Sequence, residues 1–137
     1  MEHKNLIEEV FRTKVYNKYG SREVGDMACS CEKDEGLHLN ILNNYIEILN
    51  DNLEPCKPGE IGQVYVTVLN NFVMPLLRYQ IGDMAVPSKV EQCSCGRGLP
   101  LIEKVIGRTG SMIKTNCNVQ RLAAEYFRNR CFYRPFF

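Results

Sequence analysis

The chain has 137 residues, of which 45% are apolar and 24% charged, a composition typical of a globular domain with a hydrophobic core. Its formal net charge of +1 argues against a nucleic-acid-binding protein, because no basic face is implied. No apolar run approaches the roughly 18 to 20 residues that cross a bilayer, and the N-terminus has no apolar signal core. We therefore expect a cytoplasmic protein that binds neither nucleic acid nor membrane.

The first half of the chain predicts one helix followed by short strands. Apolar residues at helical spacing predict an amphipathic helix over residues 4–13. The expected strands cover residues 14–17, 37–41 and 45–49. The turn pair Asn43-Asn44 between the last two strands predicts that they form a hairpin.

The second half of the chain predicts further strands and a terminal helix. Residues 51–59 contain two prolines and are expected to form a loop. The expected elements after it are strands over 63–69, 76–79, 84–86 and 101–105 and a helix over 122–129. Many short strands with few helices predict an α+β fold that is mostly β, a small distorted β-barrel or sandwich flanked by two helices.

Seven cysteines in a chain without a signal peptide favour metal binding or simple burial over disulfides. Four residues form a pattern typical of a metal site, namely Cys31, His38, Cys93 and Cys95. Three thiolates and one imidazole satisfy tetrahedral zinc and leave no open position, so the metal would be structural. Cys29 competes with Cys31 for this role. A second interpretation is that these side chains are buried and inert. A third is a covalent cysteine enzyme, which would need a third orienting group that this sequence does not show.

Two further segments carry residues suited to a nucleotide. In the segment Tyr19-Gly20-Ser21-Arg22-Glu23, glycine lets the backbone approach a ligand, and the carboxylate of Glu23 suits a divalent cation. In Arg78-Tyr79-Gln80-Ile81-Gly82-Asp83, we expect a glycine turn to place Asp83 just beyond a strand end. A carboxylate there accepts bidentate hydrogen bonds from two vicinal hydroxyls, as a ribose requires.

These two segments, together with Gly59-Glu60-Ile61-Gly62 and Gly107-Arg108, resemble in order and spacing the adenylate-forming (AMP-binding) enzymes. The resemblance is to the branch of phenylacetate–CoA ligase and the CapK-like proteins of capsular polysaccharide biosynthesis. It covers roughly residues 6–119. Such enzymes use ATP and Mg²⁺ to join a carboxylate to AMP and then pass the acyl group to a thiol.

The resemblance implies roles for individual residues. Tyr19 would lie against the nucleotide, Glu23 would help to hold Mg²⁺, and Asp83 would bind the ribose. Arg108 would reach the ribose or phosphate, and Gly110 would stand at the hinge of a C-terminal lid. Arg22 stands where the family usually has threonine, which leaves the details of phosphate contact open. Members of this branch also commonly have a cysteine before Gly-Leu-His and a later Cys-x-Cys-Gly-Arg, which supports the zinc site.

The resemblance implies three regions and a fragment of a larger enzyme. Residues 1–28 would end the large nucleotide-binding domain, residues 29–106 would form a small β subdomain with the zinc site, and residues 107–137 would form the hinge and a truncated C-terminal segment. The chain has no Ser/Thr/Gly-rich phosphate loop, and its end does not resemble the lid that carries a catalytic lysine. We therefore expect no complete catalytic set and no activity of the chain alone.

Two functions remain open at the level of sequence. The first is a fragment of an ATP-dependent, carboxylate-activating ligase whose intact form binds a nucleotide and a carboxylate. The second is a non-catalytic, zinc-stapled β module that acts as a scaffold or is a remnant. In either case, apolar faces that lack a partner domain predict self-association.

Overall fold

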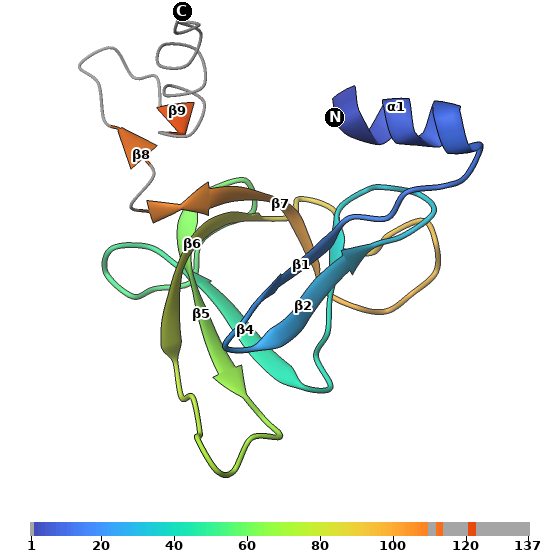
Figure 1. The fold of residues 1–137 in the computed structure, drawn as a ribbon. Coiled ribbons are helices and arrows are strands. Elements are labelled where there is room, and N and C mark those ends of the chain that lie inside the picture. Colours follow the sequence, from blue (N-terminus) through green and yellow to red (C-terminus); the bar gives the residue numbers. More distant parts are fainter. Residues whose placement is uncertain (1, 110–111, 114–120, 123–137) are drawn as a thin grey trace, which may run out of the picture.

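The computed structural model describes residues 2–109, 112–113 and 121–122. In this part of the chain, one helix precedes a series of strands (Figure 1). The elements are α1 (Glu2–Phe11), β1 (Lys18–Ser21), β2 (Gly25–Ser30), β3 (Leu37–Leu39), β4 (Asn44–Leu49), β5 (Gly62–Val68), β6 (Tyr79–Pro87), β7 (Leu101–Arg108), β8 (Met112–Ile113) and β9 (Arg121–Leu122). No helix among the described residues is long and apolar enough to span a bilayer.

Seven of the strands form one antiparallel sheet in the order β1-β2-β3-β7-β6-β5-β4. The sheet is not closed, because β1 and β4 lie at its two edges. It nevertheless curls around a core, in which Met27 of β2 packs with Val64 and Val66 of β5 and with Ile81 and Ala85 of β6. The predicted mostly β, α+β fold is therefore confirmed, with a barrel-like but open sheet.

The burial of β5 shows why this sequence forms a strand. Alternate residues of Gly62–Val68 are buried and half-buried along the whole strand. Valines at positions 64, 66 and 68 supply the buried face, and branched side chains suit a pleated, half-buried surface. The strict alternation fixes which face of β5 lies on the core, because a slip by one residue would expose all three valines.

The predicted hairpin of residues 37–41 and 45–49 is wrong, although both segments contain strands. β3 pairs with β2 on one side and with β7 on the other, whereas β4 pairs with β5, for example Ile46 with Val66. Alternation of apolar and polar residues identifies a strand but not the strand with which it pairs. Here the loop at residues 40–43 carries the chain from the middle of the sheet to its far edge (Figure 1).

The strand predicted over residues 14–17 is also wrong, because β1 begins only at Lys18. Residues 14–17 form no strand, and two of their amides donate to side chains. The amide of Val15 donates to the carboxylate of Glu8, and the amide of Asn17 donates to the hydroxyl of Ser30. A chain whose amides are satisfied by side chains does not need a ladder partner.

The strand predicted over 76–79 is wrong apart from Tyr79, where β6 begins, whereas the strand predicted over 84–86 lies within β6. The glycine of Gln80-Ile81-Gly82-Asp83 does not make a turn but lies inside the strand with φ of 82°. The register against β5 shifts there, from Tyr65 opposite Gln80 to Gln63 opposite Met84. Glycine within a strand commonly marks such a bulge, and a bulge redirects the side chains beside it.

Several sequence predictions fall partly or wholly outside the described residues. The expected terminal helix over 122–129 does so apart from Leu122, which belongs to β9. The expected hinge residue Gly110 also lies outside them. The predicted region boundaries after residues 28 and 106 fall inside β2 and β7, and the division into regions stays a prediction.

Candidate metal centre and nucleotide edge

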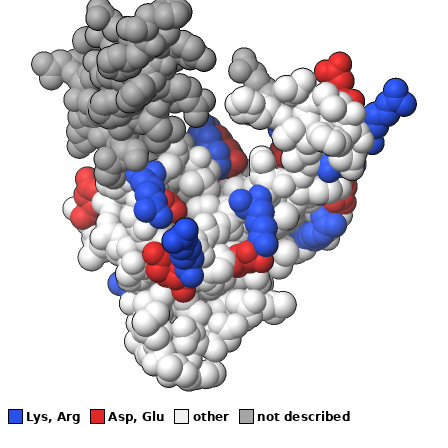
Figure 2. Space-filling view, viewed as in Figure 1, with Lys and Arg blue, Asp and Glu red and all other residues white. Residues whose placement is uncertain are grey.

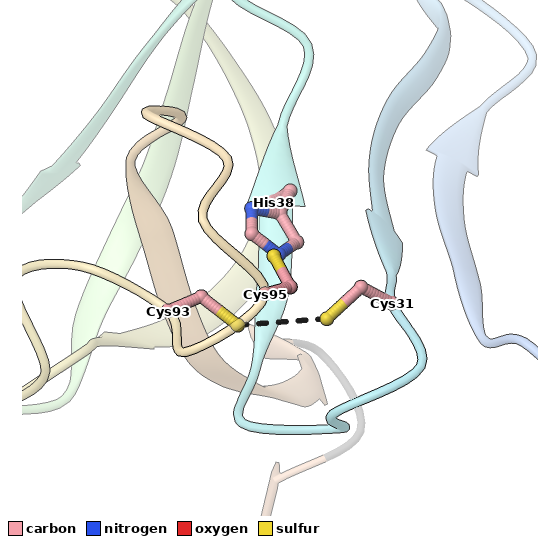
Figure 3. Close-up of side chains that lie close together, drawn as sticks. All are labelled: Cys31, His38, Cys93 and Cys95. Atoms are coloured by element: carbon pink, nitrogen blue, oxygen red, sulfur yellow. Dashed lines mark hydrogen bonds between the residues drawn. The ribbon is translucent and has the colours of Figure 1, made fainter.

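Four metal-binding side chains converge at one corner of the sheet (Figure 3). Cys31 follows the end of β2, His38 is the central residue of β3, and Cys93 lies in the loop between β6 and β7, as does Cys95. Their ligand atoms all lie within 4.8 Å of one another. Cys31 and Cys93 are 62 positions apart in the sequence, and it is the sheet that brings their segments together.

The distances at this corner fit a tetrahedral metal. The Sγ atoms of Cys31 and Cys93 are 3.5 Å apart, and Cys95 Sγ is 3.5 Å from His38 Nε2. Zinc with Zn–S bonds of about 2.3 Å would place two sulfurs about 3.8 Å apart. A disulfide would require about 2.05 Å, and both thiols are free. The donor set and its spacing therefore fit a metal ion with four protein ligands.

The burial of the side chains at this corner favours a metal with a structural role over a metal that is open to solvent. Cys31, His38 and Cys93 are each 6% exposed or less, and Cys95 is half-buried. Burial raises the pKa of Cys31, but bonds from the amide of Lys33 and from His38 and Cys93 outweigh it and lower the value to about 6. Cys29, the competing candidate, is exposed on β2 and does not belong to the group.

Acidic side chains brace the two turns that carry the cysteines. Glu35 accepts two hydrogen bonds from Ser94, one from the amide at 2.8 Å and one from the hydroxyl at 2.6 Å. Arg97 donates to Glu32 at 2.9 Å. Each pair joins the turn after Cys31 to the loop between β6 and β7. The sequence did not reveal these braces, because an acid next to a cysteine turn carries no signal for the residue it will reach.

Three of the residues expected to bind a nucleotide, Tyr19, Asp83 and Arg108, meet at a different place, here called the nucleotide edge. Tyr19 of β1 donates from its hydroxyl to Asp83 of β6 at 3.0 Å. The Nε of Arg108, which pairs with Asp83 in the β6–β7 ladder, lies 3.7 Å from the other carboxylate oxygen. Asp83 is 8% exposed. Three residues from three strands thus meet at one carboxylate, which lies in the bulge of β6 rather than beyond a strand end as expected.

Two side chains near this contact, Tyr19 and Glu23, have shifted pKa values. Burial, reinforced by the charge of Asp83 and the hydrogen bond to it, raises the pKa of Tyr19 well above its usual range. Glu23, in the exposed turn between β1 and β2, has a pKa below its usual range because of its own backbone amide, a nearby serine hydroxyl and the charge of Arg108. Glu23 therefore lies within electrostatic reach of Arg108 without joining the contact at Asp83.

A shallow basic depression of about 490 Å³ lies beside these residues. It is lined by Lys18, Gly20, Ser21, Arg22, Gly25, Asp26 and Arg108. The turn with the expected ligand-facing glycine thus forms one wall, and Arg108 forms another. A larger groove of about 630 Å³ lies against the metal corner and includes Cys31 and His38 in its lining. No motif in the sequence predicted the larger groove.

Comparison with known proteins identifies relatives of this chain. No family model matches it. It is 32% identical over 111 residues to phenylacetate–coenzyme A ligase of Thermus thermophilus, a match over 78% of this chain and 25% of the relative.

Solved structures with a similar fold are those of 2-hydroxyisobutyryl-CoA ligase. The structure in the postadenylation state with 2-HIB-AMP has a TM-score of 0.77 at 24% identity and matches 89% of this chain and 26% of its own. The structure with 2-HIB-AMP and CoA in the thioesterification state has a TM-score of 0.70 at 25% identity and matches 81% and 24%.

The chain spans about a quarter of the length of these relatives. Its matches nevertheless extend over most of the chain, in sequence to one ligase and in fold to another. Relatives of this kind were predicted by the resemblance of the segments around Tyr19, Asp83 and Arg108 to adenylate-forming enzymes. The chain therefore belongs to the adenylate-forming enzymes and is related to phenylacetate–coenzyme A ligase.

Proposed function

We propose that this chain supplies the ribose-binding edge and a zinc-stapled β subdomain to an ATP-dependent ligase that activates a carboxylate. In the complete reaction, a carboxylate attacks the α-phosphate of ATP to give an acyl adenylate and pyrophosphate, and a thiol such as that of CoA then accepts the acyl group. A CapK-like role in capsular polysaccharide biosynthesis is the finer part of this proposal.

The observation that carries this proposal is the arrangement around Asp83. A carboxylate that is 8% exposed and held by Tyr19 and Arg108 has one fixed orientation. Two vicinal ribose hydroxyls would donate to its oxygens, and Arg108 would balance the charge near the phosphates. Glu23, an exposed carboxylate in the turn between β1 and β2, would contribute an oxygen ligand to Mg²⁺. The ion would supply charge neutralisation at the phosphates.

The zinc site belongs to the same proposal. Cys31, His38, Cys93 and Cys95 would hold the ion with all four positions filled, so that it stabilises the fold and takes no part in the reaction. The described cysteines form no disulfide, which suits a reducing compartment and supports the proposed cytoplasmic location. Protein purified without chelators should therefore contain about one zinc per chain, and elemental analysis would measure this.

The proposed nucleotide edge is tested by binding rather than by turnover. In backbone-labelled protein, AMP should shift the amide resonances around Gly82, Asp83 and Arg108 and leave those around the metal corner unchanged. The chain alone should not exchange pyrophosphate into ATP, because positioning and charge stabilisation at the phosphates are incomplete. No shift at these amides with saturating AMP would contradict the proposal, as would robust exchange.

A second candidate function is a scaffold that does not bind nucleotide. The loop between β5 and β6 favours it, since residues 69–77 contain no charge and expose large apolar side chains, with Phe72 88%, Val73 99% and Leu77 75% exposed. In Figure 2, the corresponding end of the molecule shows neither blue nor red. Such a patch also supports self-association. A single monomeric mass by light scattering at high concentration would count against self-association.

A further inference from the structure

Helix α1 is held to the rest of the molecule by charge rather than by apolar packing. Lys4 Nζ contacts Asp34 Oδ2 at 2.6 Å, and the side chain of Lys4 is only 19% exposed. The large apolar side chains of the helix remain in solvent, with Leu6 57% and Phe11 70% exposed. An amphipathic helix whose apolar face is uncovered gains little from burial. The contact of Lys4 is therefore a main determinant of where α1 lies.

The segment that follows α1 is attached to the same region. Lys14 Nζ donates to the carbonyl oxygen of Glu32 at 2.9 Å. Asn17 and Ser30 exchange two bonds of 2.8 Å, from the Asn17 amide to the Ser30 hydroxyl and from the Ser30 amide to the Asn17 carbonyl. The Glu8 carboxylate also accepts from the amide at position 15 and so ties the helix to this segment. The N-terminal region thus rests on residues 30–34.

Residues 31–36 form a turn, here called the metal turn, whose shape depends on the candidate metal ligands. The amide of Asp34 donates to the carbonyl of Cys31 at 3.1 Å, and the amide of Lys33 donates to Cys31 Sγ at 3.4 Å. Asp34 itself has φ of 57°, a conformation that non-glycine residues seldom adopt without support. Cys31 begins this turn and His38 follows it closely, so a bound metal would fix both ends.

We propose that metal binding at this corner is coupled to the docking of α1 through the metal turn. The metal orders residues 31–36, and the ordered turn presents Asp34 to Lys4 and the Glu32 carbonyl to Lys14. By thermodynamic linkage the effect is reciprocal, so that contacts made by α1 strengthen metal binding by the same factor. The inference rests on the zinc part of the proposed function and is independent of the nucleotide edge.

The sharpest experiment measures metal affinity in full-length variants altered only in the N-terminal region. Lys4→Met keeps the aliphatic stem and removes the charge, and the double variant K4M/K14M removes both lysine contacts. Lys18→Met is the matched control, because Lys18 pairs with Asp26 at 2.7 Å on exposed strand residues outside the metal turn. Affinity is measured by competition between Co²⁺ and a chelator, with the thiolate-to-cobalt absorption as the signal.

We expect Lys4→Met to weaken Co²⁺ binding about two- to fivefold, as is usual for the loss of one partly shielded ion pair. K4M/K14M, which also loses the hydrogen bond from Lys14 to a carbonyl, should weaken it more. Lys18→Met should bind like the unaltered chain. Hydrogen exchange should show the same coupling from the other side: removing the metal from the unaltered chain should lower the protection of the amides of residues 2–16 by a larger factor than that of β4 and β5.

Equal Co²⁺ affinity in K4M/K14M and the unaltered chain would overturn the coupling, as would unchanged protection of residues 2–16. If the unaltered chain bound no metal, the coupling would fail together with the zinc assignment. AMP-induced shifts around Asp83 would still stand in that case, so failure of this inference is distinguishable from failure of the proposed nucleotide edge.

Discussion

The metal corner and the nucleotide edge differ in how much of a site each contains. At the metal corner, four ligands converge within 4.8 Å of one another, and acidic residues brace the turns that carry them. At the nucleotide edge, Asp83 is held by Tyr19 and Arg108, while Glu23 lies in an exposed turn and the nearby depression is shallow. The proposed metal site would have all four of its ligands among the described residues of this chain. The proposed nucleotide site would have only one wall here.

The largest expected effect follows from removing a metal ligand. Cys93→Ser should abolish metal retention and lower the free energy of unfolding by about 3 kcal/mol or more, because the metal's binding energy is part of the folding energy. Cys29→Ser is the matched control, since Cys29 is exposed on β2 and lies outside the cluster. Metal content and chemical denaturation would be measured on both. If Cys93→Ser kept its metal, the proposed ligand set would be wrong.

A smaller effect is expected from a substitution of Glu35, which is hydrogen-bonded to the turn that carries Cys93 and Cys95. Glu35→Gln keeps the size of the side chain but weakens the paired hydrogen bonds to Ser94, which position the turn of Cys93 and Cys95. Residues that orient metal ligands typically change metal affinity 10- to 100-fold, so we expect a loss of about tenfold in a chelator competition. Glu103→Gln, on the exposed face of β7, should have no effect. Equal losses in the two variants would show that Glu35 does not act as a brace.

At the nucleotide edge, we expect a substitution to weaken nucleotide binding without changing the metal content. Asp83→Asn is isosteric and removes the charge that would accept two ribose hydroxyls, so AMP binding should weaken by about tenfold. The metal content should stay that of the unaltered chain. The measurement is the AMP titration of amide resonances, with Asp51→Asn, in the exposed loop after β4, as a control away from the contact at Asp83. A parallel loss of metal and nucleotide would mean that the two regions are not independent.

The smallest expected effect concerns Tyr19. Its pKa is raised above the ordinary value of 10, by burial and by Asp83, so the folded state keeps a proton that the unfolded state releases. The associated stability is therefore fully present below about pH 10 and is lost as the pH rises toward the folded-state value. Tyr19→Phe should remove from the ultraviolet titration a tyrosine whose pKa is raised, and should cost about 1 kcal/mol. A titration that matches the unaltered chain would contradict the contact with Asp83.

The sequence predicted the strand elements, and the four side chains that cluster at the metal corner, better than the arrangement of the strands. Cys31, His38, Cys93 and Cys95 could be found because thiols and imidazole are rare residue types with few structural uses on a surface. The placement of Asp83 was predicted wrongly, since Gly82 indicates a turn equally well as a bulge inside a strand. The partners of β3 could not be predicted, because strand pairing depends on contacts distant in sequence.

Elemental analysis of the purified chain tests most directly the claim that its metal corner is complete. Protein prepared without chelators should contain about one zinc per chain. The ion should be retained through dialysis and lost in Cys93→Ser but not in Cys29→Ser. Protein that folds to the same stability with no metal bound would contradict the account, because the corner would then be a cluster of buried thiols and an imidazole.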